Sequence, residues 1–571
     1  MADAIDTNTG TTRADRRAEA ADTGPVLASD GTPLKASLRR ALRAQKLRAL
    51  MLVAPLLVFI LVTFVAPIAD MLFRSVENQI VSQTLPRTTA ELQGWESDSG
   101  DLPSEDTYRA LLTDLTLAVA ANTHTRLGSR LNYEQSGMSS IFRQTGRNID
   151  DVAAPYLDNF EALDPRWVEP GTLAALMTDP DYFAAARAWR EENPVGPFGG
   201  GATYDQPIRL NPGIGELLPS AAAIFRDWAE YVRVENSAVV GDEEPWSLFY
   251  LRLYQDLLNV SEADLGAYDG PQSDLLLETK RMLDQFQPVS IRDRFIEVDA
   301  GWGNPDIWAT IKVYSPSYTS GYFLNAVDMQ LNAEGVSMQP EDERIYGILF
   351  KRTMFMSLMI TGSCILLGYP IAWLLANLPM RTANLLMILV LLPFWTSLLV
   401  RTSAWKVMLQ QQGVINDILV WLGVVGDESR LIMINNQFGT IVAMTHILLP
   451  FMILPLYSVM QTIPPSYLRA AKSLGATPFT AFWRVYFPQS VPGIGAGSIL
   501  VFILAIGYYI TPEIVGGTSG TFISNRIAYH ISSSLNWGLA AALGSILLGA
   551  VLILYWAYDR IVGIDNVKLG G

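Results

Sequence analysis

The stretch RAAKSLGATPFTAFWRVYFP, from Arg469 to Pro488, is a basic, glycine-containing segment between two long uncharged runs. A Pro-Pro pair just before it can start a helix, Gly475 permits a turn, and Pro478 can start a second helix. The pattern therefore predicts a helix, a glycine turn and a second helix. A loop of this shape is suited to docking another protein; the alternative is an ordinary amphipathic loop.

The composition favours a membrane protein. Half of the 571 residues are hydrophobic and only 17% are charged, which is low for a soluble protein. The single cysteine, Cys364, lies in an apolar run, which excludes a disulfide within the chain and predicts a small buried residue. The three histidines have no metal-ligand spacing, so no metal site is expected at His124, His446 or His530.

Six runs are long enough and free enough of charge to cross a bilayer. The first, of 21 residues, would span about 31 Å as a helix, and a charge at mid-membrane would cost roughly 2.5–3.5 kcal/mol. The runs lie between Arg48 and Asp70, and at Thr353–Met380, Thr382–Val400, Leu431–Leu468 (apolar part Gly439–Met460), Val485–Pro512 and Ile527–Tyr558. We expect an all-α membrane protein with six transmembrane helices, the first a retained anchor rather than a cleaved signal peptide.

Basic residues near the ends of these runs indicate the orientation. Those in SLRRALRAQKLR before the first run, in the quoted loop and after the last run fall on one side if both termini are cytoplasmic. A smaller group falls on the other side, namely Arg74, Lys351, Arg352, Arg401, Lys406, Arg430 and Arg526. The balance predicts two cytoplasmic termini.

A large acidic segment follows the first run. Between Glu77 and Gly347 there are 43 acidic and 19 basic residues, against 13 and 22 in the rest of the chain. Helical patterns predominate there, with a modest strand signal in IWATIKVYS (Ile307–Ser315). The expected organisation is a disordered cytosolic tail (1–37), a basic segment with the first span (38–73), a mostly helical extracytoplasmic domain (74–347), a membrane core (348–563) and a cytosolic tail (564–571).

The stretch VMLQQQGVINDILVWLGVVG (Val407–Gly426) is apolar on one side but contains Asn416 and Asp417. This pattern suits a short interfacial or re-entrant helix. If the stretch crossed the membrane instead, the following topology would invert.

The quoted loop resembles a motif of the permease subunits of bacterial ABC importers: Glu-Ala-Ala, three residues, Gly, nine residues, Ile, any residue, Leu-Pro. The matching positions, with the spacing intact, are Arg469, Ala470, Ala471, Gly475, Val485, Phe487 and Pro488. Val and Phe preserve apolar character, but Arg in place of the leading Glu reverses a charge. That change puts in doubt any salt bridge between the usual Glu and the ATPase.

Other stretches are similar to the spermidine/putrescine-type permeases, a type I importer family. They include PFWTSLLVRTSAWKVML, THILLPFMILPLYSVMQTIPPSYLRAAKSLGA, PGIGAGSILVFILAIGYYITPEIVGG and NWGLAAALGSILL, and the resemblance covers roughly residues 345–560 and the first run. It implies the type I permease fold in a bacterial inner membrane. The acidic segment, between helices 1 and 2, departs from the family's usual short first loop.

The resemblance also implies the partners. Loop 462–488 would sit in a cleft of a separate cytosolic ATPase dimer that binds ATP and Mg, beside a second permease subunit, by family habit a different one. An extracytoplasmic solute-binding protein would deliver a small molecule, and nucleic acid is not an expected partner. The chain itself would be no enzyme and hold no cofactor; none of its eight lysines follows a glycine, which excludes a P-loop.

Polar or aromatic residues inside the runs or at their outer ends are candidates to contact the solute: Trp395, Thr396, Arg401, His446, Tyr508, Tyr509 and Glu513. Packing, capping and solvation are the alternatives for each. Where many polyamine-type permeases have Asp, this chain has Tyr508, so one electrostatic reason to pass a polyvalent cation is missing. Tyrosines can hold a cation by π interaction or stack on a neutral solute. Polyamine is therefore the family default.

The glycine-rich stretch GIGAG and the acidic segment each have an expected role and an alternative one. GIGAG (Gly493–Gly497) opens a membrane run, which favours close helix packing over a nucleotide fingerprint. The acidic segment is expected to steer a basic surface of the solute-binding protein, or else to be a solvated scaffold. Two other classes of protein are less favoured. An ion-coupled secondary transporter would need carboxylates within the runs, and the six runs have none. A membrane sensor would need a cytosolic signalling domain, and only short tails and loops are expected in the cytosol.

Overall fold

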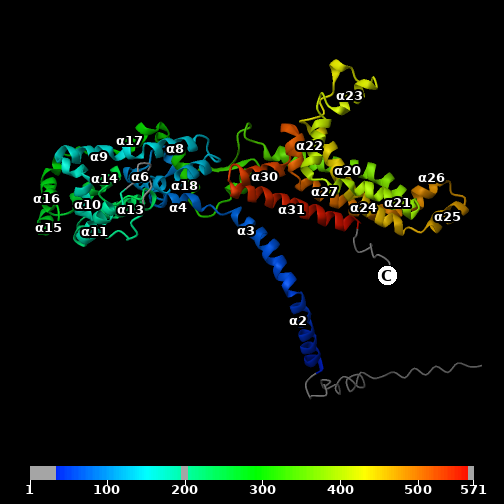
Figure 1. Ribbon diagram of the computed structural model, residues 1–571, viewed down its shortest axis with the longest axis horizontal. Helices are drawn as coiled ribbons and strands as arrows, with labels where there is room; N and C mark the ends of the chain where they lie inside the picture. The colour runs from blue at the N-terminus through cyan, green and yellow to red at the C-terminus, as the bar shows by residue number, and fades with distance from the viewer. Residues whose placement is uncertain (1–33, 195–202, 563–571) are drawn as a thin grey trace, which may run out of the picture. The chain divides into compact units, whose positions relative to one another are not determined.

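The structure, a computed structural model, describes residues 34–194 and 203–562 (Figure 1). These residues are mostly helical, as expected, with one antiparallel hairpin of β1 (Met329–Asn332) and β2 (Gly335–Met338). The chain divides into two compact units, residues 1–73 and 74–571. The expected tails fall outside the described residues, except that residues 34–37 already belong to a helix.

The described part of the first unit is one continuous helix. It comprises α2 (Leu34–Ile60), a π-helical turn η1 (Leu61–Val65) and the start of α3 (Ala66–Arg74). The part Gln45–Arg74 is long and apolar enough to cross a membrane, and it contains the first expected run.

Both π-helical turns come just before a proline. Turn η1 ends two residues before Pro67, and turn η8 (Phe482–Tyr486) ends two residues before Pro488. Proline lacks an N–H and its ring clashes with the carbonyl four residues earlier in a regular helix. The wider turn, closed by Ala66 N–H to Leu61 O and Phe487 N–H to Phe482 O, lets both helices continue.

The acidic segment (residues 74–347) folds as many short helices around one large core. The core is rich in buried aromatic rings, including Trp167, Trp302 and Trp308, which no longer contact solvent. The helices are α4 (Gln79–Thr84), α5 (Pro86–Leu92), α6 (Glu105–Ala120), α7 (His124–Leu131), α8 (Met138–Arg147), α9 (Ile149–Leu163), α10 (Pro170–Met177), α11 (Pro180–Glu192), α12 (Pro212–Leu217), α13 (Pro219–Glu235), α14 (Ser247–Asn259), α15 (Glu262–Ala267), α16 (Ser273–Met282), α17 (Ile291–Val298), α18 (Pro305–Val313) and α19 (Gly321–Asn325).

The strand expected at Ile307–Ser315 is wrong, because most of this stretch forms helix α18. The Asn304 side chain accepts a hydrogen bond from Asp306 N–H, and Pro305 occupies the first helical turn. These two residues start a helix at the point where the β-branched composition favours a strand. The helix then buries Ile307, Trp308 and Ile311 in the core.

A buried ion pair joins three parts of the acidic segment. Arg130 Nη1 lies 2.5 Å from Glu134 Oε1, and the two side chains are 7% and 1% exposed. Glu134 also accepts hydrogen bonds from Tyr314 OH at 2.6 Å and Asn325 Nδ2 at 3.0 Å. Burial and the Glu134 carboxylate raise the pKa of Tyr314, which keeps its hydroxyl a donor. Arg130 Nε donates to Tyr322 OH at 2.8 Å.

The membrane core is built around three long helices (Figure 1): α20 (Tyr346–Asn377), α24 (Gln437–Thr462) and α27 (Phe487–Gly507). Cys364 is buried among them, as expected, and its Sγ lies 3.6 Å from Thr445 O. The expected tight glycine packing is confirmed: a Cβ added at Gly493 would lie 3.3 Å from Leu456 Cα and Pro455 O of α24.

The third expected run is a bent pair of helices. The first arm, α21 (Met380–Leu391) with η6 (Leu392–Trp395), meets the second, α22 (Leu398–Met408), at 93°. Pro393 is the second residue of the short η6 turn, and the Ser397 side chain accepts from Val400 N–H and so starts a new helix. The described residues therefore hold five continuous spanning-length helices, or six if the bent pair counts as one span.

The fourth run forms α24, while the last two differ from their expected ends. The fifth is one continuous helix from Pro478 to Gly507 rather than Val485–Pro512. Short helices α28 (Ile510–Val515) and α29 (Gly517–Gly520) follow it. The sixth is broken into α30 (Ile523–Ser532) and α31 (Trp537–Val562), because Leu535 has a φ of +54° and Asn536 Oδ1 caps Leu539 N–H.

The stretch Val407–Gly426 contains the end of α22 and one short helix, α23 (Val414–Trp421), which is too short to cross a membrane. The buried Asn416 amide donates to Gln410 O and Leu431 O, and its oxygen accepts from Leu431 N–H. Asn416, which made a membrane crossing unfavourable in the sequence, thus stabilises the loop through these hydrogen bonds.

Candidate coupling loop and translocation path

The first half of the coupling loop (residues 462–488) is helix α25 (Pro465–Ser473). Gly475 follows it with a φ of +90°, a conformation that other residues rarely adopt. The helix end is closed by hydrogen bonds from Gly475 N–H to Lys472 O and from Ala476 N–H to Ala471 O. Arg469 and Ala470 are exposed on this helix, and Ala471 is half-buried.

The second half of the loop is not a separate helix. Helix α26 (Pro478–Ala481), capped by the Thr477 hydroxyl, continues through η8 into α27 without a break. Val485 lies in the π turn, and the Phe487 ring packs 4.8 Å from that of Trp483. Pro488 is exposed in the first turn of α27.

The tip of the loop presents apolar side chains to solvent. Leu474 is 89% exposed and Phe479 is 73% exposed, beside the basic Arg469 and Lys472. Arg469 makes no ion pair within residues 45–194 and 203–560. Exposed apolar residues next to unpaired charges are typical of a protein-docking surface.

Three of the expected path residues come together. Arg401 on α22 interacts electrostatically with His446 on α24 and with Tyr508, which follows α27. The ring of Trp405, also on α22, packs edge-on against His446 at 5.5 Å. Arg401 Nε and His446 Nδ1 are buried without a hydrogen-bond partner. The group therefore combines one cationic side chain with the aromatic rings of Trp405, His446 and Tyr508.

The other expected path residues lie elsewhere. Trp395, 81% exposed, and Thr396 lie at the bend before α22, where Thr396 Oγ1 donates to Pro393 O. Tyr509 is exposed, and its carbonyl accepts from Asn525 Nδ2 at 2.9 Å. Glu513 accepts from the same amide at 2.5 Å and lines a cavity of about 490 Å³.

Sequence reasoning missed several residues around these groups. Trp405 lies four residues after Arg401, a spacing that places both on one helix face, and this signal was available. Arg352 and Arg526 line the cavity beside Glu513, but the sequence marked them only as exceptions to the orientation rule. Their proximity depends on folding across more than 150 residues.

The described residues thus form a membrane-type protein with several long apolar helices and an exposed loop that leads into one of them. Residues 368–562 match the family model described as the binding-protein-dependent transport system inner membrane component. The chain is 35% identical over 221 residues to the spermidine/putrescine transport system permease protein PotB of Escherichia coli, covering 38% of this chain and 80% of that protein.

Two further likenesses were found. The chain is 34% identical over 226 residues to the inner membrane ABC transporter permease protein YdcU of E. coli, covering 37% of this chain and 70% of that protein. A crystallised bacterial alginate ABC transporter chain matches with 18% identity and a TM-score of 0.33, covering 40% of this chain and 81% of that one. The chain belongs to the binding-protein-dependent transport family and is an ABC importer permease of the polyamine type. The acidic segment lies outside the matched residues.

Proposed function

We propose that the chain is driven by a separate cytosolic ATPase dimer, which binds ATP and Mg and docks on loop 462–488. A second permease subunit completes the pathway, and an extracytoplasmic binding protein delivers the solute to a face formed partly by residues 74–347. Both termini are then cytoplasmic. The observation that carries the proposal is the exposed tip at Leu474 and Gly475 on a loop joined directly to a spanning helix.

The continuous helix suggests how the motion is transmitted. Its 30 residues, Pro478–Gly507, begin in the docking loop and end one residue before Tyr508, beside Arg401. At 1.5 Å per residue the helix covers roughly 45 Å. Because a helix resists compression, a displacement of the tip by the ATPase would reach the Arg401–His446–Tyr508 group.

The solute class has two candidates. The relatives named for spermidine and putrescine make a polyamine the first candidate. The second is a solute that carries a carboxylate, because the cationic Arg401 is near enough to Tyr508 to interact with it electrostatically and would repel a polycation. Both are small organic solutes.

The prediction is that substitution of Arg401 separates these candidates. The reconstituted permease pair, its ATPase and binding protein are titrated with spermidine, putrescine and zwitterionic solutes while ATP hydrolysis is measured. If the solute bears a carboxylate, Arg401→Gln lowers the solute-stimulated rate about tenfold, since one charge-assisted bond is lost. If it is a polyamine, the rate is raised, because the substitution removes a repelling positive charge.

The control is Lys406→Gln, which removes an exposed cation from the same helix. Equal effects of both variants on every solute would contradict a role for Arg401 in the path.

The docking role of residues 74–347 is tested in the same assay. If stimulation by the binding protein does not change with ionic strength, this segment has no electrostatic docking role and acts only as a scaffold.

A further inference from the structure

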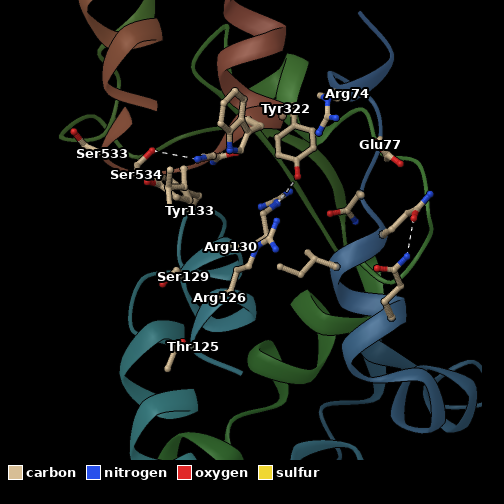
Figure 2. Close-up of a pocket in the computed structure, with 18 residues that line it drawn as sticks. Arg74, Glu77, Thr125, Arg126, Ser129, Arg130, Tyr133, Tyr322, Ser533 and Ser534 are labelled. Carbon is tan, nitrogen blue, oxygen red and sulfur yellow. Dashed lines mark hydrogen bonds between the residues drawn. The ribbon is translucent and has the colours of Figure 1, made fainter. Parts of the chain in front are cut away.

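A cavity of about 590 Å³ lies between the acidic segment and the start of helix α31, within the second unit (Figure 2). One wall is the face of α7 that carries Arg126, Ser129 and Arg130. The opposite wall is the connection from α30 to α31, including Ser534 and Asn536. Figure 2 shows Arg126 and Arg130 rising from one helix, with Ser533 and Ser534 on the loop across from them.

Two residues that line this cavity each have one buried donor atom that lacks an acceptor. Arg130 Nη2 and Asn536 Nδ2 have no hydrogen-bond partner, although their residues are only 7% and 6% exposed. The remaining Arg130 nitrogens are satisfied by Glu134 and Tyr322, and the Asn536 oxygen caps Leu539 N–H. Both unsatisfied atoms can only donate, so they call for an acceptor-rich ligand.

The charges of the lining residues also favour an anionic ligand. Arg126 lies one turn before Arg130 and makes no ion pair within residues 45–194 and 203–560, whereas Arg130 is paired with Glu134, so Arg126 adds an unbalanced positive charge to this helix face. The first turn of the 26-residue helix α31 adds backbone N–H groups and the positive end of its dipole. The charged lining is three arginines and one carboxylate (Arg74, Arg126, Arg130 and Glu77) in an otherwise acidic segment.

We propose that this cavity binds an anionic phosphate group, and the surroundings favour the headgroup of an acidic phospholipid. The cavity opens beside Trp537, the first residue of a helix apolar enough to cross the membrane. Trp537 and Leu535 are 48% and 63% exposed at this edge. A tryptophan at the end of a spanning helix is typical of the membrane–water boundary, where lipid phosphates lie.

This site shares no residue with loop 462–488 or with the Arg401–His446–Tyr508 group. A bound headgroup would join α7 of the acidic segment to α31 of the membrane core and so fix one on the other. Because the proposal is tested by binding rather than by transport, its failure and that of the proposed function are distinguishable.

The experiment measures binding of three probes to the purified full chain by native mass spectrometry and by displacement of one bound probe by another. The probes are phosphatidylglycerol, phosphatidylcholine and inorganic phosphate. The test variants are Arg126→Gln and Asn536→Asp; the second keeps the oxygen that caps α31 but replaces the free donor with a negative charge. The control is Arg147→Gln, an exposed arginine of α8 outside the cavity.

We expect saturable binding of phosphatidylglycerol over phosphatidylcholine, weakened about tenfold or more by each test variant and unchanged in the control. Binding of inorganic phosphate with the same dependence on the variants, without a lipid preference, would support the anion site and assign it to a soluble ligand. Absence of binding of both phosphatidylglycerol and inorganic phosphate, or equal behaviour of all three variants, would overturn the proposal.

Discussion

Replacement of Gly475 by valine is expected to reduce solute-stimulated ATP hydrolysis to its basal rate. Gly475 ends helix α25 with a φ of +90°, and a left-handed conformation costs an ordinary L-residue roughly 1–2 kcal/mol, with a higher cost for a β-branched residue. A Cβ at this position would meet no atom within 4 Å, so the effect comes from the backbone alone. The measurement is ATPase activity of the reconstituted pair with its binding protein.

The matched variant is Gly475→Asn, because asparagine tolerates positive φ better than valine. We expect it to retain a substantial part of the stimulation. Normal stimulation in Gly475→Val, with an unchanged melting temperature of the complex, would show that the turn at the loop tip does not couple the subunits.

Glu134→Gln is expected to cost the acidic segment about 3–5 kcal/mol of stability, because the buried Arg130 charge would lose its partner. Glutamine has nearly the same size, so packing is preserved and the lost charge is isolated. Native-state hydrogen exchange on the full chain should show protection of α7, α18 and α19 falling about a hundredfold to several thousandfold.

The control for this change is Glu91→Gln on α5, where the side chain is exposed. A surface substitution of this kind should change stability by no more than about 0.5 kcal/mol. If Glu134→Gln matched the control, the Arg130–Glu134 pair would not hold the three helices together.

The sequence predicted most of the helices of spanning length, because a helix that crosses lipid requires a long run without charge. It did not predict the 93° bend, which depends on Pro393 and on the Ser397 hydroxyl capping a new helix. The break before α31 likewise depends on one left-handed residue, Leu535. A hydropathy pattern is averaged over many residues and therefore does not report a single cap or a single left-handed residue.

Helix α18 shows a different limit. Its composition is rich in residues that favour strands, and the signals that decide otherwise are the cap at Asn304 and the proline after it. Both residues are visible in the sequence just before the stretch. These local start signals outweighed the strand propensity of the stretch. Burial of two large apolar side chains and a tryptophan in the core further stabilises the helix.

The candidate site was predictable only in part. The loop pattern places Gly475 at the turn and Arg469 on an exposed helix, because these depend on neighbours in the chain. The meeting of Arg401, His446 and Tyr508 depends on three different elements, and no spacing in the sequence reports it. Arg130 and Asn536 line one cavity although about 400 residues separate them.

The most direct test of the docking claim uses the single native cysteine, which is buried. Leu474→Cys therefore creates one accessible thiol at the loop tip, and Trp421→Cys creates one on α23, where the side chain is 84% exposed. Each thiol is labelled with a photo-crosslinker in the assembled transporter, and adducts are identified by mass spectrometry. We predict an ATPase adduct from Leu474→Cys and none from Trp421→Cys; an ATPase adduct from Trp421→Cys alone, or none from Leu474→Cys, would contradict coupling through this loop.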